Sequence, residues 1–242
     1  LVQSRGGFWT TRPALNTAGI SFFDQQRSQS QYHFDSTKHD QPGEWFNVFG
    51  RFHGSWDSEL AEVVTNSKKI NWENIAGTNN ASMTPARQQR IDSQELDIVR
   101  GGGDPKMTLV QANTDVRQYP VFANMIDFFE LERVTARVHV QMTGQVFNYH
   151  VDAYPHYADA DPESLIRIIV CLEDWVPGHF YLYGTHNYSH WKAGDFHTFK
   201  WQDVPHATAN ASLAPRTSLI ITGLKTARTR EILAQKYTEF RV

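Results

Sequence analysis

From residue 134 onward the hydrophobic pattern changes from a helical to a two-residue period, and this change limits the fold more than any other feature. In VTARVHVQM, residues 134–142, apolar and polar residues alternate as they do in a strand with one buried face. Further segments of strand character follow between turns such as VPG and WKAGD: QVFNYHVD, LIRIIVCL, HFYLYG, DFHTFKW and RTSLIITG. Short strands at this spacing predict a mainly β fold with a sandwich or jelly-roll core and flanking helices.

Three segments outside this β region have helical character. Thr84 is a candidate N-cap for a helix that ends at the glycines from Gly101. RGGGDPK, which follows, lacks the ending of a phosphate-binding loop and is interpreted as a turn. YPVFANMIDFFELER, residues 119–133, has apolar residues at helical spacing, and ARTREILAQKY, residues 227–237, also has a helical pattern.

We therefore predict a single domain over residues 1–242. Residues 1–133 form a loop and helix region that packs on the core. Within it, the aromatic residues and turn formers of residues 1–80 favour short strands and ordered loops over disorder. Residues 134–224 form the jelly-roll core and residues 225–242 a C-terminal helix.

Charge and cysteine content exclude some classes of function. The net charge of −3 gives no basic field for nucleic acid or an anionic membrane. No apolar run of about 18 residues predicts a membrane span, and the first residues lack the apolar core of a signal peptide. Cys171 is the only cysteine, which favours a reducing compartment such as the cytoplasm.

NYHVDAYPHY, residues 148–157, contains the first candidate metal ligands. His150 and Asp152 are two residues apart on a predicted strand, so they share a face with Cα atoms about 7 Å apart. His156 lies beyond Pro155 and cannot be assumed to share that face. A surface His-Asp pair without metal is the alternative interpretation.

A third candidate ligand and a nearby arginine strengthen the interpretation of this pair as part of a metal site. His206 comes ten residues before Arg216, which opens a new strand and shares a face with Ser218. Two histidines and one carboxylate leave positions open on a metal, as in the facial triad of non-haem Fe(II) oxygen chemistry. An arginine beside such a site suits bidentate binding of a carboxylate, with a serine hydroxyl adding a hydrogen bond.

This order resembles the Fe(II)- and 2-oxoglutarate-dependent dioxygenases. Their pattern is His-x-Asp, a distal His, and then Arg-x-Ser, and here it reads His150-Val-Asp152, His206 and Arg216-Thr-Ser218. The resemblance covers residues 134–224, because WKAGDFHTF and RIIVCLEDWVPGHFYLY also look like the family's intervening strands. LIRIIVCL and HWKAG look most similar to the aspartyl/asparaginyl β-hydroxylase-like branch. Well-known members of that branch lack the carboxylate ligand that Asp152 provides, so the branch stays open.

The resemblance implies a double-stranded β-helix that binds Fe(II) through His150, Asp152 and His206. Arg216 and Ser218 would bind 2-oxoglutarate. The enzyme would consume O2, release succinate and CO2, and hydroxylate an amino-acid, peptidyl or small-molecule substrate. An aspartate at this ligand position favours hydroxylation over halogenation. A metal-binding jelly-roll module without turnover, and desaturation or epimerisation by the same iron site, are the alternatives.

Four further residues are weaker candidates. In the β-hydroxylase-like branch an arginine that matches Arg167 contacts 2-oxoglutarate, whereas an ion pair with a nearby acid is the structural alternative. Asn148 is a second candidate contact for 2-oxoglutarate or substrate, with ordinary hydrogen bonding as its alternative. Tyr154 and His156 are candidates for the substrate mouth.

Overall fold

Two β-sheets form the framework of the residues described in the computed structural model, which are 45–69, 111–150, 152, 154, 157–202, 204–235 and 237–242. The side chains of residues 68, 69, 111, 148–150 and 238 are not among those described. All of these residues belong to one compact unit. The helix predicted from Thr84 lies outside the described residues.

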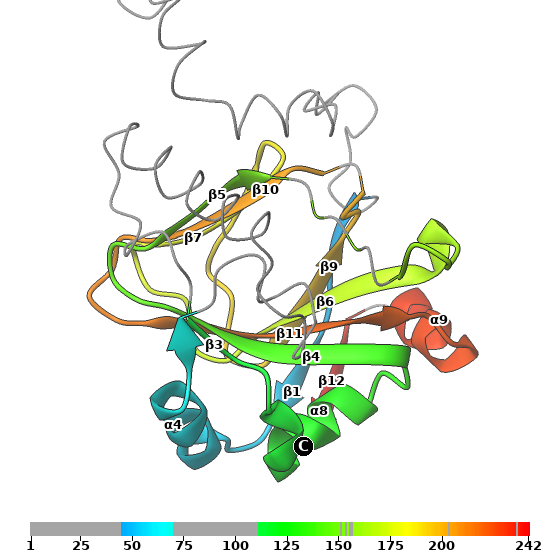
Figure 1. Cartoon of the computed structure of the whole chain (residues 1–242), viewed down its shortest axis with the longest axis horizontal. Coiled ribbons are helices and arrows are strands. Elements are labelled where there is room, and N and C mark those ends of the chain that lie inside the picture. Colours follow the sequence, from blue (N-terminus) through cyan, green and yellow to red (C-terminus); the bar gives the residue numbers. More distant parts are fainter. Residues whose placement is uncertain are drawn as a thin grey trace, which may run out of the picture. The chain divides into compact units, whose positions relative to one another are not determined.

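The larger sheet has the strand order β12-β1-β9-β6-β11-β4-β3-β2 (Figure 1). Its strands are β1 (Phe46–His53), β2 (Lys68–Lys69), β3 (Gln111–Asn113), β4 (Glu132–Gln141), β6 (Leu165–Cys171), β9 (Asp195–Phe199), β11 (Arg216–Leu224) and β12 (Thr238–Arg241). The smaller sheet has the order β5-β10-β7-β8. Its strands are β5 (Val146–His150), β7 (His179–Tyr183), β8 (His186–Tyr188) and β10 (His206–Asn210).

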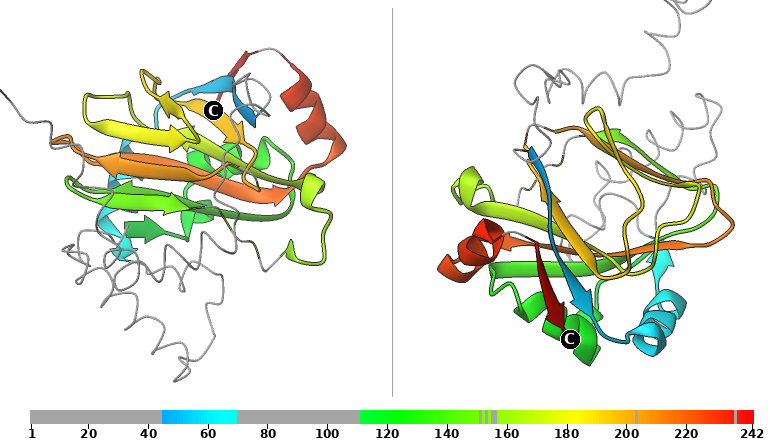
Figure 2. Two further views of the ribbon diagram at one scale, coloured as in Figure 1. Left: turned by 90° about the horizontal axis from the view of Figure 1, so that it is seen from above. Right: turned by 180° about the vertical axis from the view of Figure 1, so that it is seen from behind.

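The eight strands from β4 to β11 form a jelly roll. β4, β11, β6 and β9 are antiparallel neighbours in the larger sheet, and β5, β10, β7 and β8 are antiparallel neighbours in the smaller one. The chain crosses between the sheets at every step except β7 to β8, and the two sheets face each other in the right view of Figure 2. The predicted mainly β jelly-roll fold is therefore confirmed.

Helices cover the outer face of the larger sheet. They are α4 (Asp57–Thr65), α8 (Pro120–Asp127) and α9 (Ala227–Ala234), with short 3₁₀ turns at Val116–Gln118 and Pro162–Ser164 (Figure 1). Pro120 occupies the first turn of α8, and the Thr226 side chain caps α9 by accepting a hydrogen bond from the Thr229 N–H. No helix among the described residues is long and apolar enough to cross a membrane.

Two predicted helices are shorter than expected. The helix predicted over residues 119–133 ends at Asp127, because Glu130 and Arg133 have φ values of 49° and 50° and turn the chain into β4. The prediction of helix over 225–242 is wrong beyond Ala234. There the chain becomes extended and forms β12, which pairs in parallel with β1.

The larger sheet separates two hydrophobic clusters. The outer cluster packs side chains of the sheet, such as Val138, Leu219 and Phe196, against Phe122 and Met125 of α8. The inner cluster lies between the sheets and joins aromatic residues of the smaller sheet to Ile169 and Ile220 of the larger one. Polar residues that alternate with the outer cluster along β4, β6 and β11 therefore face the space between the sheets.

Candidate active site between the sheets

β5 and β10 bring the two predicted histidine ligands opposite each other. The antiparallel register pairs His206 with His150, so the two positions are direct neighbours across the strands. The His206 side chain is buried among the rings of Tyr183 and Phe199, whose centroids lie 6.1 and 4.7 Å from the imidazole. The side chain of His150 is not among those described.

Asp152 meets His206 directly after β5. Its Oδ2 atom lies 3.6 Å from Nε2 of His206, and each side chain is only 6% exposed. Two ligands about 2.1 Å from one cation and at right angles to each other lie about 3 Å apart. The observed separation is therefore close to what a shared metal ion requires.

Arg167 and Tyr154 hold the Asp152 carboxylate in place. Nη1 of Arg167 forms an ion pair with Oδ2, and the Tyr154 hydroxyl donates a hydrogen bond of 2.9 Å to the same oxygen. Nη1 also donates to the Tyr154 oxygen at 3.0 Å. Burial raises the pKa of Tyr154 well above its ordinary value. Burial lowers the pKa of Arg167, but the charge of Asp152 outweighs this and raises it overall, so the guanidinium stays protonated.

Arg216 begins β11 and is fixed by neutral groups. Its Nε donates a hydrogen bond of 2.9 Å to Oε1 of Gln141, the residue opposite it in β4. Its guanidinium carbon lies 4.0 Å from the centre of the Tyr181 ring. Nη1 is buried and has no hydrogen-bond partner among the described residues. Ser218, two residues along the same strand, is also buried.

The donor chemistry of these residues fits the implied metal and keto acid. Imidazole nitrogen and carboxylate oxygen suit Fe(II), and a buried guanidinium with an open N–H group suits a carboxylate. Among the described side chains no three His, Cys, Asp or Glu residues gather into a metal-binding group. The three-ligand set stays a prediction, because its third member is His150.

The remaining predicted residues have different positions. Arg167 pairs with Asp152, which is the structural alternative considered for it, and Tyr154 bonds to the same carboxylate. Asn148 is in β5, and its side chain is not described. His156 lies outside the described residues.

Sequence reasoning missed several residues that shape this site. Gln141 accepts a hydrogen bond from Arg216, and the ring of Tyr181 stacks against the Arg216 guanidinium. Arg137 and His139 share the inner face of β4 with Gln141. The two-residue period of β4 could have placed all three β4 residues on one face. It could not show that Arg216 would lie opposite Gln141, because this depends on the register between distant strands.

A buried Tyr–His pair closes the aromatic side of the inter-sheet space. The Tyr183 hydroxyl and Nε2 of His197 are 2.7 Å apart, and both side chains are buried. Burial, with a contribution from Arg216, lowers the pKa of His197 to about 3. The imidazole is thus neutral at physiological pH, and the surrounding rings shield the site from water.

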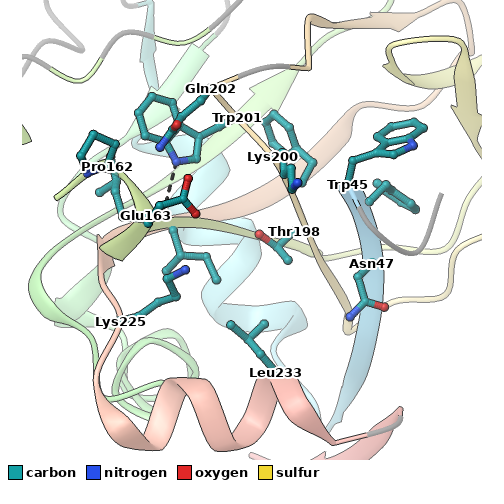
Figure 3. Close-up of a pocket in the computed structure, with 14 residues that line it drawn as sticks. Trp45, Asn47, Pro162, Glu163, Thr198, Lys200, Trp201, Gln202, Lys225 and Leu233 are labelled. Carbon is teal, nitrogen blue, oxygen red and sulfur yellow. Dashed lines mark hydrogen bonds between the residues drawn. The ribbon is translucent and has the colours of Figure 1, made fainter. Parts of the chain in front are cut away.

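A cavity of about 220 Å³ lies beside the site, where the start of β1, the start of β6 and the end of β9 meet (Figure 3). Trp201 lines it, donates a hydrogen bond of 3.3 Å to the Leu165 carbonyl, and packs edge-on against Tyr154 at 4.6 Å. Of the predicted metal and cosubstrate residues whose side chains are described, none lines this cavity. It therefore contacts the Asp152 network only from outside.

Comparisons with known proteins give limited similarity. No family model matches the chain, and no curated protein matches it. A prolyl-4-hydroxylase from Pseudomonas putida is 17% identical with a TM-score of 0.35, over 61% of this chain and 91% of that one. A cupin 2 conserved barrel domain protein from Salinispora arenicola is 10% identical with a TM-score of 0.31, over 51% and 82%.

A non-heme monooxygenase in complex with nickel is 17% identical with a TM-score of 0.33, over 38% of this chain and 43% of that one. Similarities this low identify neither a family nor an activity.

Proposed function

We propose that the protein is an Fe(II)- and 2-oxoglutarate-dependent oxygenase that hydroxylates a C–H bond of an amino-acid, peptidyl or small-molecule substrate. In this reaction O2 and 2-oxoglutarate are consumed, one oxygen atom enters the substrate, and succinate and CO2 are released. The observation that carries the proposal is the buried guanidinium of Arg216, which faces the same inter-sheet space as Asp152 and His206.

A buried cation is costly unless an anion compensates for it, and Arg216 forms no ion pair among the described residues. Its hydrogen-bond and ring partners, Gln141 and Tyr181, are neutral, and Glu173 interacts with it only through charge. A metal-only jelly roll has no need for such a residue. A dicarboxylate that chelates a metal at one end and meets Arg216 at the other would satisfy both features. Ser218 would add a hydrogen bond to that distal carboxylate.

Each group of side chains has a separate task. His150, Asp152 and His206 would hold the iron, which together with the keto acid supplies the oxidising chemistry when bound. Arg167 and Tyr154 orient the Asp152 carboxylate, in the way that outer partners usually fix metal ligands. Tyr183, Phe199 and the neighbouring rings keep water from the reacting atoms.

The first test measures 2-oxoglutarate binding by calorimetry, with the Mn(II)-loaded protein in the absence of oxygen. Arg216→Gln should weaken binding at least about tenfold, because the charged hydrogen bonds to the carboxylate are lost. Arg133→Gln is the matched control, since Arg133 is an exposed arginine in β4 that pairs with Asp159, and it should bind like the wild type.

A second test measures Fe(II)-dependent succinate release, which His150→Ala should abolish. Unchanged release in this variant would refute the metal assignment. Metal binding without measurable 2-oxoglutarate binding would instead indicate the non-catalytic module. Product analysis would separate hydroxylation from desaturation or epimerisation.

A further inference from the structure

In the part of the chain that the structure describes, three arginines face the space between the sheets, and the proposed site accounts for two of them. Arg167 is paired with Asp152, and Arg216 is assigned to the cosubstrate. The third, Arg137, lies on the inner face of β4, opposite Ile220 of β11. No acidic side chain among the described residues pairs with it.

The surroundings of Arg137 hold its guanidinium at one end only. Nε donates a hydrogen bond of 2.8 Å to Nε2 of His139, two residues along the same strand. His139 in turn lies opposite Ser218. Because Nε2 accepts this bond, the imidazole is the neutral tautomer with its proton on Nδ1. The two terminal nitrogens of Arg137 have no partner among the described residues, and the residue is only half-buried.

The charges around Arg137 set the kind of ligand. Burial and the positive charges of Arg137 and Arg167 lower the pKa of His139 well below its ordinary value, so it adds no charge at neutral pH. Burial, and then Arg167, lower the pKa of Arg137 to about 10, so the guanidinium stays protonated. Asp152 also acts on Arg137, but it is already paired with Arg167, so the two arginines and Asp152 together leave one net positive charge. That charge, with a planar pair of N–H groups, matches a single carboxylate. A phosphate dianion would leave a negative charge without a partner.

We propose that Arg137, oriented by His139, binds a carboxylate group of the substrate that is oxidised. The substrate would thus be an organic acid. This inference rests on the proposed oxygenase function and specifies its substrate class. Arg137 lies four residues from Gln141, which is about 13 Å along the strand. It is therefore displaced from the Arg216 end of the site toward Asp152, where a substrate must approach.

The experiment uses two fluorinated probes of the same shape, 4-fluorobenzoate and 4-fluorobenzamide, which differ in charge. Their binding to the full chain, loaded with Zn(II) and saturated with 2-oxoglutarate, is followed by ¹⁹F NMR. The wild type and the control Arg133→Gln should bind the acid at least about tenfold more tightly than the amide. Arg137→Gln should lose this preference, and Arg137→Lys, which keeps the charge but not the planar fork, should retain part of it.

The affinity of the same variants for 2-oxoglutarate, measured by calorimetry, distinguishes the outcomes that would contradict the proposal. An Arg137→Gln protein that still prefers the acid, or a wild type without preference, would overturn the proposal. Loss of 2-oxoglutarate binding in Arg137→Gln would assign Arg137 to the cosubstrate instead. If the wild type does not bind 2-oxoglutarate, the oxygenase proposal fails separately. The probes are then compared in an Arg216→Gln background, where the preference for the acid must still depend on Arg137.

Discussion

Tyr154 shares one hydroxyl group between Asp152 and Arg167, and this makes it the most direct test of how the carboxylate is held. Tyr154→Phe removes one atom and leaves the ring against Trp201. The carboxylate then loses one of the anchors described for it, and Mn(II) affinity should fall about 10-fold, as is common when an outer partner of a metal ligand is removed. Titration of Mn(II) followed by electron paramagnetic resonance measures this affinity.

Tyr157→Phe provides the matched control for this substitution. The Tyr157 hydroxyl donates to the carbonyl oxygens of Arg133 and Thr222 and makes no described contact with Asp152. This variant should bind Mn(II) like the wild type. Equal affinities in the two variants would show that Tyr154 does not position the metal ligand.

The spacing of residues along the chain predicted which side chains lie together when they belong to one strand or directly follow it. The sequence spacing of Asp152 from His150, and of Arg216 from His206, predicted that these residues form one site. In the structure Asp152 and His206 do lie together, and their role as metal ligands remains a prediction. The sequence did not predict that Gln141 would hold Arg216 or that Tyr154 would hold Asp152. Their hydrogen bonds join residues through side-chain orientation and cross-strand register, which no local pattern encodes.

The junction of β1 and β9 depends on one glycine. Gly194, just before β9, has a φ of +88°, and a Cβ atom there would lie 2.1 Å from the Phe52 carbonyl oxygen. Gly194→Ala should therefore lower the free energy of unfolding by about 2–4 kcal/mol, because backbone strain and a steric clash add. Urea denaturation measures this loss.

A substitution at Gly144 separates the cost of backbone strain from the cost of the steric clash. It has a φ of +82° in an exposed turn, so Gly144→Ala should cost only about 1 kcal/mol from the backbone conformation. If the Gly194→Ala protein is as stable as the Gly144→Ala protein, the close approach of the Phe52 carbonyl oxygen adds no destabilisation beyond the backbone strain.

Strands with clear alternation were predictable, and strands without it were not. Six predicted segments correspond to β4, β5, β6, β7, β9 and β11. β10 was missed because its sequence, HATAN, has only alanines on its outer face and polar residues on its inner face. β12 was missed because four residues after a helix have too little pattern, and only pairing with β1 makes them a strand.

The stability of the protein as a whole should depend on pH through one half-buried and one buried group, whose effects have opposite signs. Burial raises the pKa of Glu173 to about 7, although the Thr217 N–H donates to its carboxylate, whereas burial lowers the pKa of His197 to about 3. Above a pH of about 4.5, the unfolded Glu173 ionises before the folded one, so stability falls as pH rises through 7. Below a pH of about 6.5, the unfolded His197 takes up a proton before the folded one, so stability falls as pH falls.

Glu173→Gln should remove the first of these effects and keep the hydrogen bond from Thr217. We expect the variant and the wild type to be equally stable near pH 4, and the variant to be about 1–3 kcal/mol more stable at pH 8. Chemical denaturation at several pH values measures the difference. Parallel pH profiles for the two proteins would show that the Glu173 carboxyl group titrates normally.

The parallel pairing of β1 with β12 has a consequence for how the protein is made. Gly50 is paired with Thr238, and β9 lies on the other side of β1, so both neighbours of this strand come from the distant end of the sequence. During translation β1 leaves the ribosome long before either partner exists, with its apolar residues and backbone edges exposed. Contacts of such long range form slowly, and unpaired strand edges promote aggregation. The nascent chain should therefore depend on chaperones until the ribosome has released β12.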